Sequence, residues 1–140
     1  MEEELQLPKH DQPEEKQQEL IFKLSMFEQQ IQQLQQQLQA VEQGINEMDG
    51  LNNGLNELIG SVGKEILASI GRGVFVKAKL LSEDLTIDIG NKTFVKKKIP
   101  EAQELIKKQI EKLKDVKKEL ENNLEQIGEE MMKIYEEGKN

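Results

Sequence analysis

The sequence predicts an α+β fold in which a long antiparallel coiled-coil hairpin carries two β-hairpins between its helices. Two observations point to it. Apolar residues recur in alternating steps of four and three along two long segments, and the period changes to two in the segment between them. We therefore expect a flexible acidic N-terminal segment (1–19), a coiled-coil helix (20–60), two β-hairpins forming an oligomerisation body (61–99) and a second coiled-coil helix (100–140).

An unbroken heptad repeat predicts the first helix. A helix with about 3.6 residues per turn that keeps an apolar seam every 3.5 residues or so must supercoil around a partner helix. Asn52 continues this seam as a polar residue, which can specify register at a cost in stability. We expect the helix to fray or bend before Gly60. The apolar seam residues are Leu20, Leu24, Phe27, Ile31, Leu34, Leu38, Val41, Ile45, Met48, Leu55 and Ile59.

Pro100 favours a first helical turn, and a second heptad seam follows it. Lys117 occupies one seam position, and we expect it to form an ion pair with Glu121 on the same helix. Two matched helices joined by a short insert most simply fold back as an antiparallel pair, which brings the chain ends together at one tip. The apolar residues of the second seam are Ile106, Ile110, Leu113, Leu120, Leu124, Ile127, Met131 and Ile134.

The insert is predicted to form four strands, near 65–70, 74–80, 85–89 and 93–97, because β-branched residues alternate between glycine-containing turns. A β unit of fewer than about 40 residues is too small to fold alone, and its strands would leave open edges. We therefore expect it to complete itself against other subunits. The predicted oligomerisation residues are Ile66, Val74, Val76, Leu85, Ile87, Ile89 and Phe94.

Composition argues against catalysis and against several kinds of partner. The chain has no cysteine and one histidine, His10, and its carboxylates alternate with lysines, so we expect no enzyme activity, no metal and no cofactor. It begins with acidic residues, and no apolar run approaches the roughly 20 residues needed to span a bilayer, so we expect a cytoplasmic protein without membrane contact. The net charge of -8 argues against nucleic acid. The one basic cluster, Lys92 with 96–98, is interpreted as an edge strand protected from unwanted pairing.

Apolar residues exceed the seam at the predicted tip. A two-helix arm cannot bury apolar side chains on all sides, so some of them should be exposed, and flexible methionines suit the binding of varied apolar partners. The alternative is a locally thicker core or a frayed end. The candidate residues for such binding are Leu20, Ile21, Phe22, Leu24, Met131, Met132, Ile134 and Tyr135.

The order of coiled coil, two β-hairpins and coiled coil resembles the α-type subunits of archaeal prefoldin, whose β-type subunits have a single hairpin. The strand sequences agree with this resemblance. They are Glu65-Ile66-Leu67, Gly73-Val74-Phe75-Val76-Lys77-Ala78, Leu85-Thr86-Ile87-Asp88-Ile89-Gly90 and Phe94-Val95.

The resemblance implies an ATP-independent chaperone subunit. It implies a hexamer of two α-type and four β-type subunits, in which the β-hairpins complete a β-barrel body. The coiled-coil tips of such a hexamer capture unfolded proteins, prevent their aggregation and deliver them to a group II chaperonin. Three alternatives stay open: a filament-forming γ-type prefoldin, a structural coiled-coil spacer, and a nucleic-acid-binding coiled coil that uses the lysine cluster.

Overall fold

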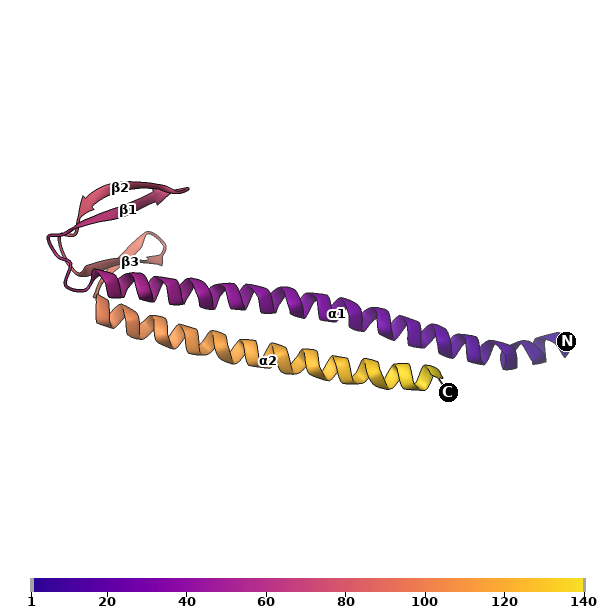
Figure 1. Ribbon diagram of the computed structural model, residues 1–140. Helices are drawn as coiled ribbons and strands as arrows, with labels where there is room; N and C mark the ends of the chain where they lie inside the picture. The colour runs from indigo at the N-terminus through magenta and orange to yellow at the C-terminus, as the bar shows by residue number, and fades with distance from the viewer. Residues whose placement is uncertain (1, 140) are drawn as a thin grey trace. The chain divides into compact units, whose positions relative to one another are not determined.

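The computed structural model describes residues 2–139 of the chain, with the side chains of residues 14–138. Met1 and Asn140, which end two of the predicted segments, lie outside the described residues. The elements follow in the order α1, β1, β2, β3, β4 and α2 (Figure 1). The chain divides into two compact units, Met1–Glu42 with Asp115–Asn140, and Gln43–Lys114. Each unit contains a stretch of both helices, and the second also contains the four strands.

Helix α1 extends from Glu2 to Leu58. The helix therefore includes residues 2–19. The flexibility that we predicted for this segment stays a prediction. The helix ends before the predicted limit because Gly60 adopts a left-handed conformation, with φ of 77°, that stops helices. The hydroxyl of Ser61 donates to the carbonyl oxygen of Glu57 at 2.9 Å and so satisfies one of the last carbonyls. Ile59 lies outside the helix and is exposed, so its place in the seam was wrongly predicted.

Helix α2 extends from Ile99 to Lys139. Pro100 lies in the first turn, where its missing N–H removes no helical hydrogen bond. Glu101 adds a negative charge near the N-terminus, which the helix dipole favours. Ile99 is fully buried. Its packing therefore fixes the start of α2, directly after strand residue Lys98.

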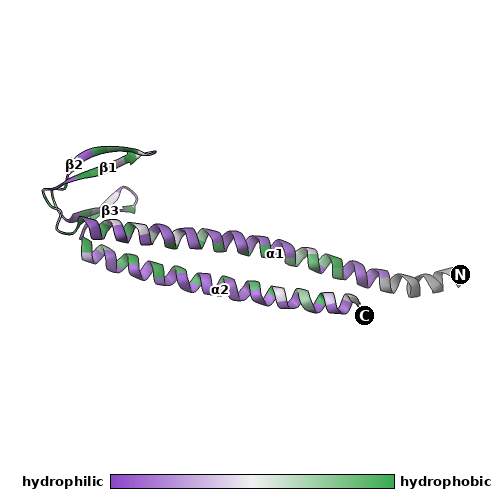
Figure 2. Ribbon diagram, in the orientation of Figure 1, coloured by the Kyte–Doolittle hydropathy of each residue, from purple (hydrophilic) through white to green (hydrophobic). Residues whose placement is uncertain are grey.

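The seam positions are the helical positions that lose solvent exposure. On α1 every predicted seam residue from Leu20 to Leu55 is buried or half-buried, and on α2 the same holds from Ile106 to Ile134. Nearly all intervening positions are exposed. Figure 2 shows the corresponding recurrence of hydrophobic residues among hydrophilic ones along both helices. The coiled-coil prediction is confirmed.

In the first unit the two helices lie antiparallel. Phe27 shares a groove with Ile134, and Glu42, further along α1, lies beside Lys117, earlier in α2. The Nζ atom of Lys117 is 3.7 Å from Oε1 of Glu42, so the predicted ion pair with Glu121 was wrong. A side chain at a seam position faces the partner helix, and Lys117 therefore finds its carboxylate across the seam.

The second unit holds most of the buried apolar side chains among the described residues. These are Ile45, Leu55, Ile99, Ala102, Ile106 and Ile110. Its helices are also antiparallel, because a Cβ atom added at Gly44 would lie 3.5 Å from Cδ1 of Leu113, whereas Gln103 contacts residues near the end of α1.

A polar layer interrupts this core. Nε2 of Gln103 donates to Oδ1 of Asn56 at 2.6 Å and approaches the carbonyl oxygen of Asn52 at 3.5 Å. Oδ1 of Asn52 is buried and accepts no hydrogen bond from the described residues. Asn52 thus occupies a core position, as its place in the heptad predicted, with one polar atom unsatisfied.

The insert forms two separate two-stranded antiparallel sheets, which confirms the prediction of two hairpins. Strand β1 (Glu65–Gly71) pairs with β2 (Val74–Lys79), and β3 (Asp84–Gly90) pairs with β4 (Thr93–Lys98). Each strand therefore has one unpaired edge. The structure thus has two long helices with two antiparallel hairpins between them in the chain.

No helix in the described part of the chain contains a segment long and apolar enough to cross a membrane.

Candidate functional site

The α1 side of the candidate tip divides into seam residues and exposed residues. Leu20 and Leu24 are half-buried in the seam. Ile21 and Phe22 point away from it, and each is 65% exposed. The heptad explains this division, because successive residues of a helix are about 100° apart and cannot all face one partner helix. Two large apolar side chains are therefore presented to solvent side by side.

The α2 side shows the same division. Ile134 is only 8% exposed, and Met131 is half-buried. Met132 and Tyr135, the residues that follow them, are both exposed. Of the eight predicted client-binding residues, four thus belong to the seam and four form an exposed set, which we call the exposed tip residues: Ile21, Phe22, Met132 and Tyr135.

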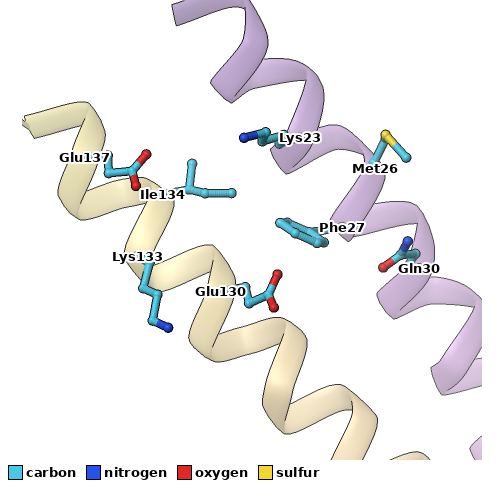
Figure 3. Close-up of a pocket in the computed structure, with 8 residues that line it drawn as sticks. All are labelled: Lys23, Met26, Phe27, Gln30, Glu130, Lys133, Ile134 and Glu137. Atoms are coloured by element: carbon cyan, nitrogen blue, oxygen red, sulfur yellow. The ribbon is translucent and has the colours of Figure 1, made fainter. Parts of the chain in front are cut away.

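A groove of about 380 Å³ lies between the helices at this level (Figure 3). The aromatic ring of Phe27 and the side chain of Ile134 project into the space between the two ribbons (Figure 3). Met26, on the outer side of α1, completes its apolar lining. The polar lining residues are Lys23, Gln30, Glu130, Lys133 and Glu137. Lysine and glutamate side chains thus surround a small apolar patch in the groove.

Met26 and Phe27 are residues that the candidate list omitted. Phe27 was predicted only as a seam residue, although an aromatic ring larger than its aliphatic neighbours is a signal for an incompletely closed seam. Met26 is exposed next to Phe27. Its flexible thioether side chain can adapt to apolar groups of different shapes.

The predicted oligomerisation residues lie on one face of the first hairpin but on both faces of the second. Ile66, Leu85 and Ile87 are half-buried, whereas the other four (Val74, Val76, Ile89 and Phe94) are exposed. In the second hairpin Phe94 pairs with Asp88, so it lies on the face opposite to Leu85 and Ile87. A single flat partner surface could therefore not contact all of the predicted residues of the second hairpin at once.

Sequence reasoning missed three exposed apolar residues of the first hairpin, Leu67, Ile70 and Phe75. Leu67 is 68% exposed and lies on the same face as Phe75. The strict alternation of strand residues was the available signal, because Leu67 and Ile66 cannot share a face. The first hairpin thus has apolar side chains on both faces.

The lysine cluster does not form one patch. Lys96 and Lys98 lie on one face of the second hairpin, and Lys97 lies on the other, opposite Leu85. Lys92 lies in the turn. Strand β4 has an unpaired edge, in agreement with the interpretation of the cluster as an edge strand. Among the described residues, no group of three or more His, Cys, Asp or Glu side chains is placed to hold a metal ion.

Comparison with known proteins identifies the family of this chain. The family of prefoldin subunits matches residues 27–139, which include both seams and both hairpins. The chain belongs to the prefoldin family. It is 31% identical over 112 residues to prefoldin subunit alpha of Methanobrevibacter smithii, a match that covers 79% of this chain and 77% of the relative. It is 22% identical over 92 residues to prefoldin subunit alpha of Methanosphaera stadtmanae, covering 66% and 67%.

The fold also matches a solved prefoldin. One chain of the filamentous prefoldin from Methanocaldococcus jannaschii superposes with a TM-score of 0.71 at 19% identity, covering 82% of this chain and 97% of that one. Membership of the family, with relatives named as alpha subunits in archaea, makes this chain an α-type prefoldin chaperone subunit. Prefoldin subunits form a chaperone family rather than an enzyme family, and they assemble with other prefoldin subunits and act on client proteins.

Proposed function

We propose that this prefoldin subunit holds unfolded polypeptides, without ATP, on the exposed tip residues and the adjoining groove, and thereby prevents their aggregation. The observation that supports the proposal is the division at the tip. The seam already uses Leu20, Leu24, Met131 and Ile134 to hold the helices together, so the exposed tip residues are free to bind a client.

The chemistry of this surface suits a broad client range. An unfolded chain offers apolar side chains in no fixed geometry, and a surface of one phenyl ring, one phenol and flexible or branched aliphatic groups can adapt to them. Burying one large apolar side chain contributes about 1.5–3 kcal/mol, so a few contacts give weak, reversible binding.

Charge around the tip limits what else can bind. Between Glu119 and Asn140 the sequence has seven acidic and two basic residues. This excess of negative charge keeps apolar groups in solution and repels nucleic acid. The groove itself has Lys23 on the α1 side and Glu130, Lys133 and Glu137 on the α2 side, so a client of either charge finds a compatible neighbour.

The proposal includes assembly and transfer. Two copies of this chain would join four β-type subunits through the strand edges of the hairpins, closing β-barrels, because each strand has one unpaired edge. Several weak tips on one body then bind one client together, which multiplies the apparent affinity. The complex would deliver its client to a group II chaperonin.

Replacing only the exposed tip residues tests client binding. In the variant Ile21→Ser, Phe22→Ser, Met132→Ser, Tyr135→Ser, the seam is intact, so helicity and assembly with a β-type subunit should match wild type. The aggregation of a chemically denatured client is followed by light scattering. The variant should need at least about tenfold more chaperone than wild type to suppress it, because the loss of even one apolar contact lowers the affinity by about that factor.

The matched control removes exposed apolar residues of the same helices outside the tip. Leu51, Leu105 and Val116 are exposed on α1 and α2, and the variant with serine at all three should protect clients like wild type. Equal loss in both variants would indicate that general surface hydrophobicity, and not the tip, holds the client. Full protection by the tip variant would place client binding elsewhere.

The likeness to a filamentous prefoldin supports a second candidate, assembly of this chain with itself into filaments. Electron microscopy and mass measurement of the purified chain, alone and mixed with a β-type subunit, separate the two. Discrete hexamers formed only in the mixture support the first candidate, and filaments of the chain alone support the second.

A further inference from the structure

The two hairpins repeat one pairing scheme. Every pair in the first hairpin has a counterpart nineteen residues later in the second, from Glu65 with Lys79 and Asp84 with Lys98 to Gly71 with Val74 and Gly90 with Thr93. The irregularity before the turn falls at the same place in both, between Ser69 and Gly71 and between Asp88 and Gly90. Alternation of exposed and half-buried residues along β1 and β3 is also identical.

The turns repeat as well. Gly71 and Gly90 have φ of 117° and 101°, and the two residues after each also have positive φ. In both hairpins the glycine N–H donates to a side chain two residues earlier, to Oγ of Ser69 at 3.3 Å and to Oδ1 of Asp88 at 2.8 Å. Such two-residue turns with positive φ match the twist of the strands.

The sequences of the two hairpins confirm the correspondence. When residues 65–79 are aligned with residues 84–98, six of the fifteen positions have the same residue in both hairpins. They are Ile70 and Ile89, Gly71 and Gly90, Phe75 and Phe94, Val76 and Val95, Lys77 and Lys96, and Lys79 and Lys98. Geometry and sequence thus describe one hairpin unit present twice.

The repeated unit gives both hairpins a common surface. Phe75 and Phe94 are at corresponding positions, 55% and 60% exposed, and each lies on the face that also contains the two shared lysines of its hairpin. An exposed phenylalanine beside lysines on a strand with a free edge is a surface for a partner strand, since pairing would cover the edge and the ring at once.

Two of the differences between the hairpins change the character of their faces. On the half-buried face, Ala78 lies opposite Ile66 in the first hairpin, whereas Lys97 lies opposite Leu85 in the second. On the other face, Leu67 in the first hairpin corresponds to Thr86 in the second. The first hairpin therefore has large apolar side chains on both faces, and the second places a half-buried lysine, Lys97, on its apolar face.

We propose that the insert is a duplicated subunit-binding hairpin whose two copies have diverged in specificity. The first copy accepts an apolar strand edge of another prefoldin subunit, and the second accepts a strand edge with a carboxylate facing Lys97. A lysine covered by an apolar partner would lose its hydration without compensation, so its position selects a partner of opposite charge. The inference rests on assembly with other prefoldin subunits and is independent of client binding at the tip.

Binding to an archaeal β-type prefoldin subunit, measured with the full-length chain at two salt concentrations, tests the divergence. Lys97→Met keeps most of the apolar stem and removes the charge, so the affinity should fall about tenfold and depend less on salt. The matched control Lys92→Met, in the turn and outside both strands, should bind like wild type. Ala78→Lys should weaken binding about 100-fold, whereas Ala78→Met, which adds bulk without charge, should weaken it much less.

Several results would overturn the proposal. These are binding by Lys97→Met as tight as wild type, binding by Ala78→Lys as tight as by Ala78→Met, or association of the wild-type chain only with itself. Loss of client protection in the tip variant leaves these measurements unaffected, so the two hypotheses fail separately.

A chimaera tests the repeat itself. When the sequence of residues 65–79 replaces residues 84–98, both hairpins should fold, and strand amides in both should be protected from hydrogen exchange in the same pattern. The chimaera should bind fewer β-type subunits per chain by native mass spectrometry, because it lacks the lysine that selects one of them. Unprotected amides in the transplanted hairpin, or unchanged stoichiometry and affinity, would contradict the proposal.

Discussion

The helices and the hairpins of this prefoldin subunit differ in the solvent exposure of their apolar residues. Along α1 and α2 the seam residues are buried or half-buried by the facing helix of the same chain. In the hairpins, large apolar side chains such as Leu67 and Phe94 are mostly exposed, and each sheet has only two strands. Isolated two-stranded sheets are at best marginally stable in water. The seam residues are thus covered within one chain, whereas we propose that strands of other subunits complete the hairpins.

Deleting the hairpins should produce the largest change. A chain without residues 63–98, its helices joined by a short glycine-serine loop, keeps both seams, so it should remain helical by circular dichroism. It should form no complex with a β-type subunit in size-exclusion chromatography with light scattering, because the unpaired strand edges are gone. Normal assembly of this deletion variant would show that the helices, and not the hairpins, form the subunit interface.

A charge placed in the seam should unfold the helical pair. Leu120 is buried, and Leu120→Asp introduces an unpaired carboxylate there, so we expect a loss of about 3–5 kcal/mol in the free energy of unfolding. Val116 lies one turn earlier on the same helix and is exposed. Val116→Asp should change the thermal midpoint little, and similar midpoints for the two variants would contradict the assignment of the seam.

The polar layer of the second unit offers a smaller effect of opposite sign. Asn52→Leu removes a buried, unsatisfied carbonyl oxygen and adds apolar contact, so it should stabilise the chain by about 1–2 kcal/mol in urea unfolding. Asn53→Leu, at the adjacent exposed position, is the control and should be close to neutral. Destabilisation by Asn52→Leu would mean that the amide makes an interaction that compensates for its burial.

The smallest effect concerns the two turns. Lys92 has φ of 60°, a conformation that costs a residue with a Cβ atom about 1 kcal/mol, whereas Gly73 at the corresponding place has φ of 76°. Lys92→Gly should therefore stabilise its hairpin by somewhat less than 1 kcal/mol, since glycine also loses more entropy on folding. Gly73→Lys should destabilise the other hairpin by a similar amount. Hydrogen exchange of the strand amides measures both, and equal signs would contradict the assignment of the turns.

The sequence by itself determined the elements of this protein. Heptad spacing located both seams, and the alternation of residues around Gly71 and Gly90 located four strands to within about a residue. These features depend on local periodicity and turn chemistry, which a segment carries in its own residues. The resemblance to prefoldin α-type subunits rested on the same local features, and the family match confirmed it.

Only the tertiary structure decided how exposed each candidate side chain is and which distant residues meet. The heptad places Leu20 in the seam and its neighbour Ile21 outside it, but the 65% exposure of Ile21 depends on what packs around the helix. Lys117 has a carboxylate within reach on its own helix, but it pairs with Glu42, which is distant in the sequence. Contacts between segments far apart in the chain depend on how the helices pack, and no local pattern encodes that geometry.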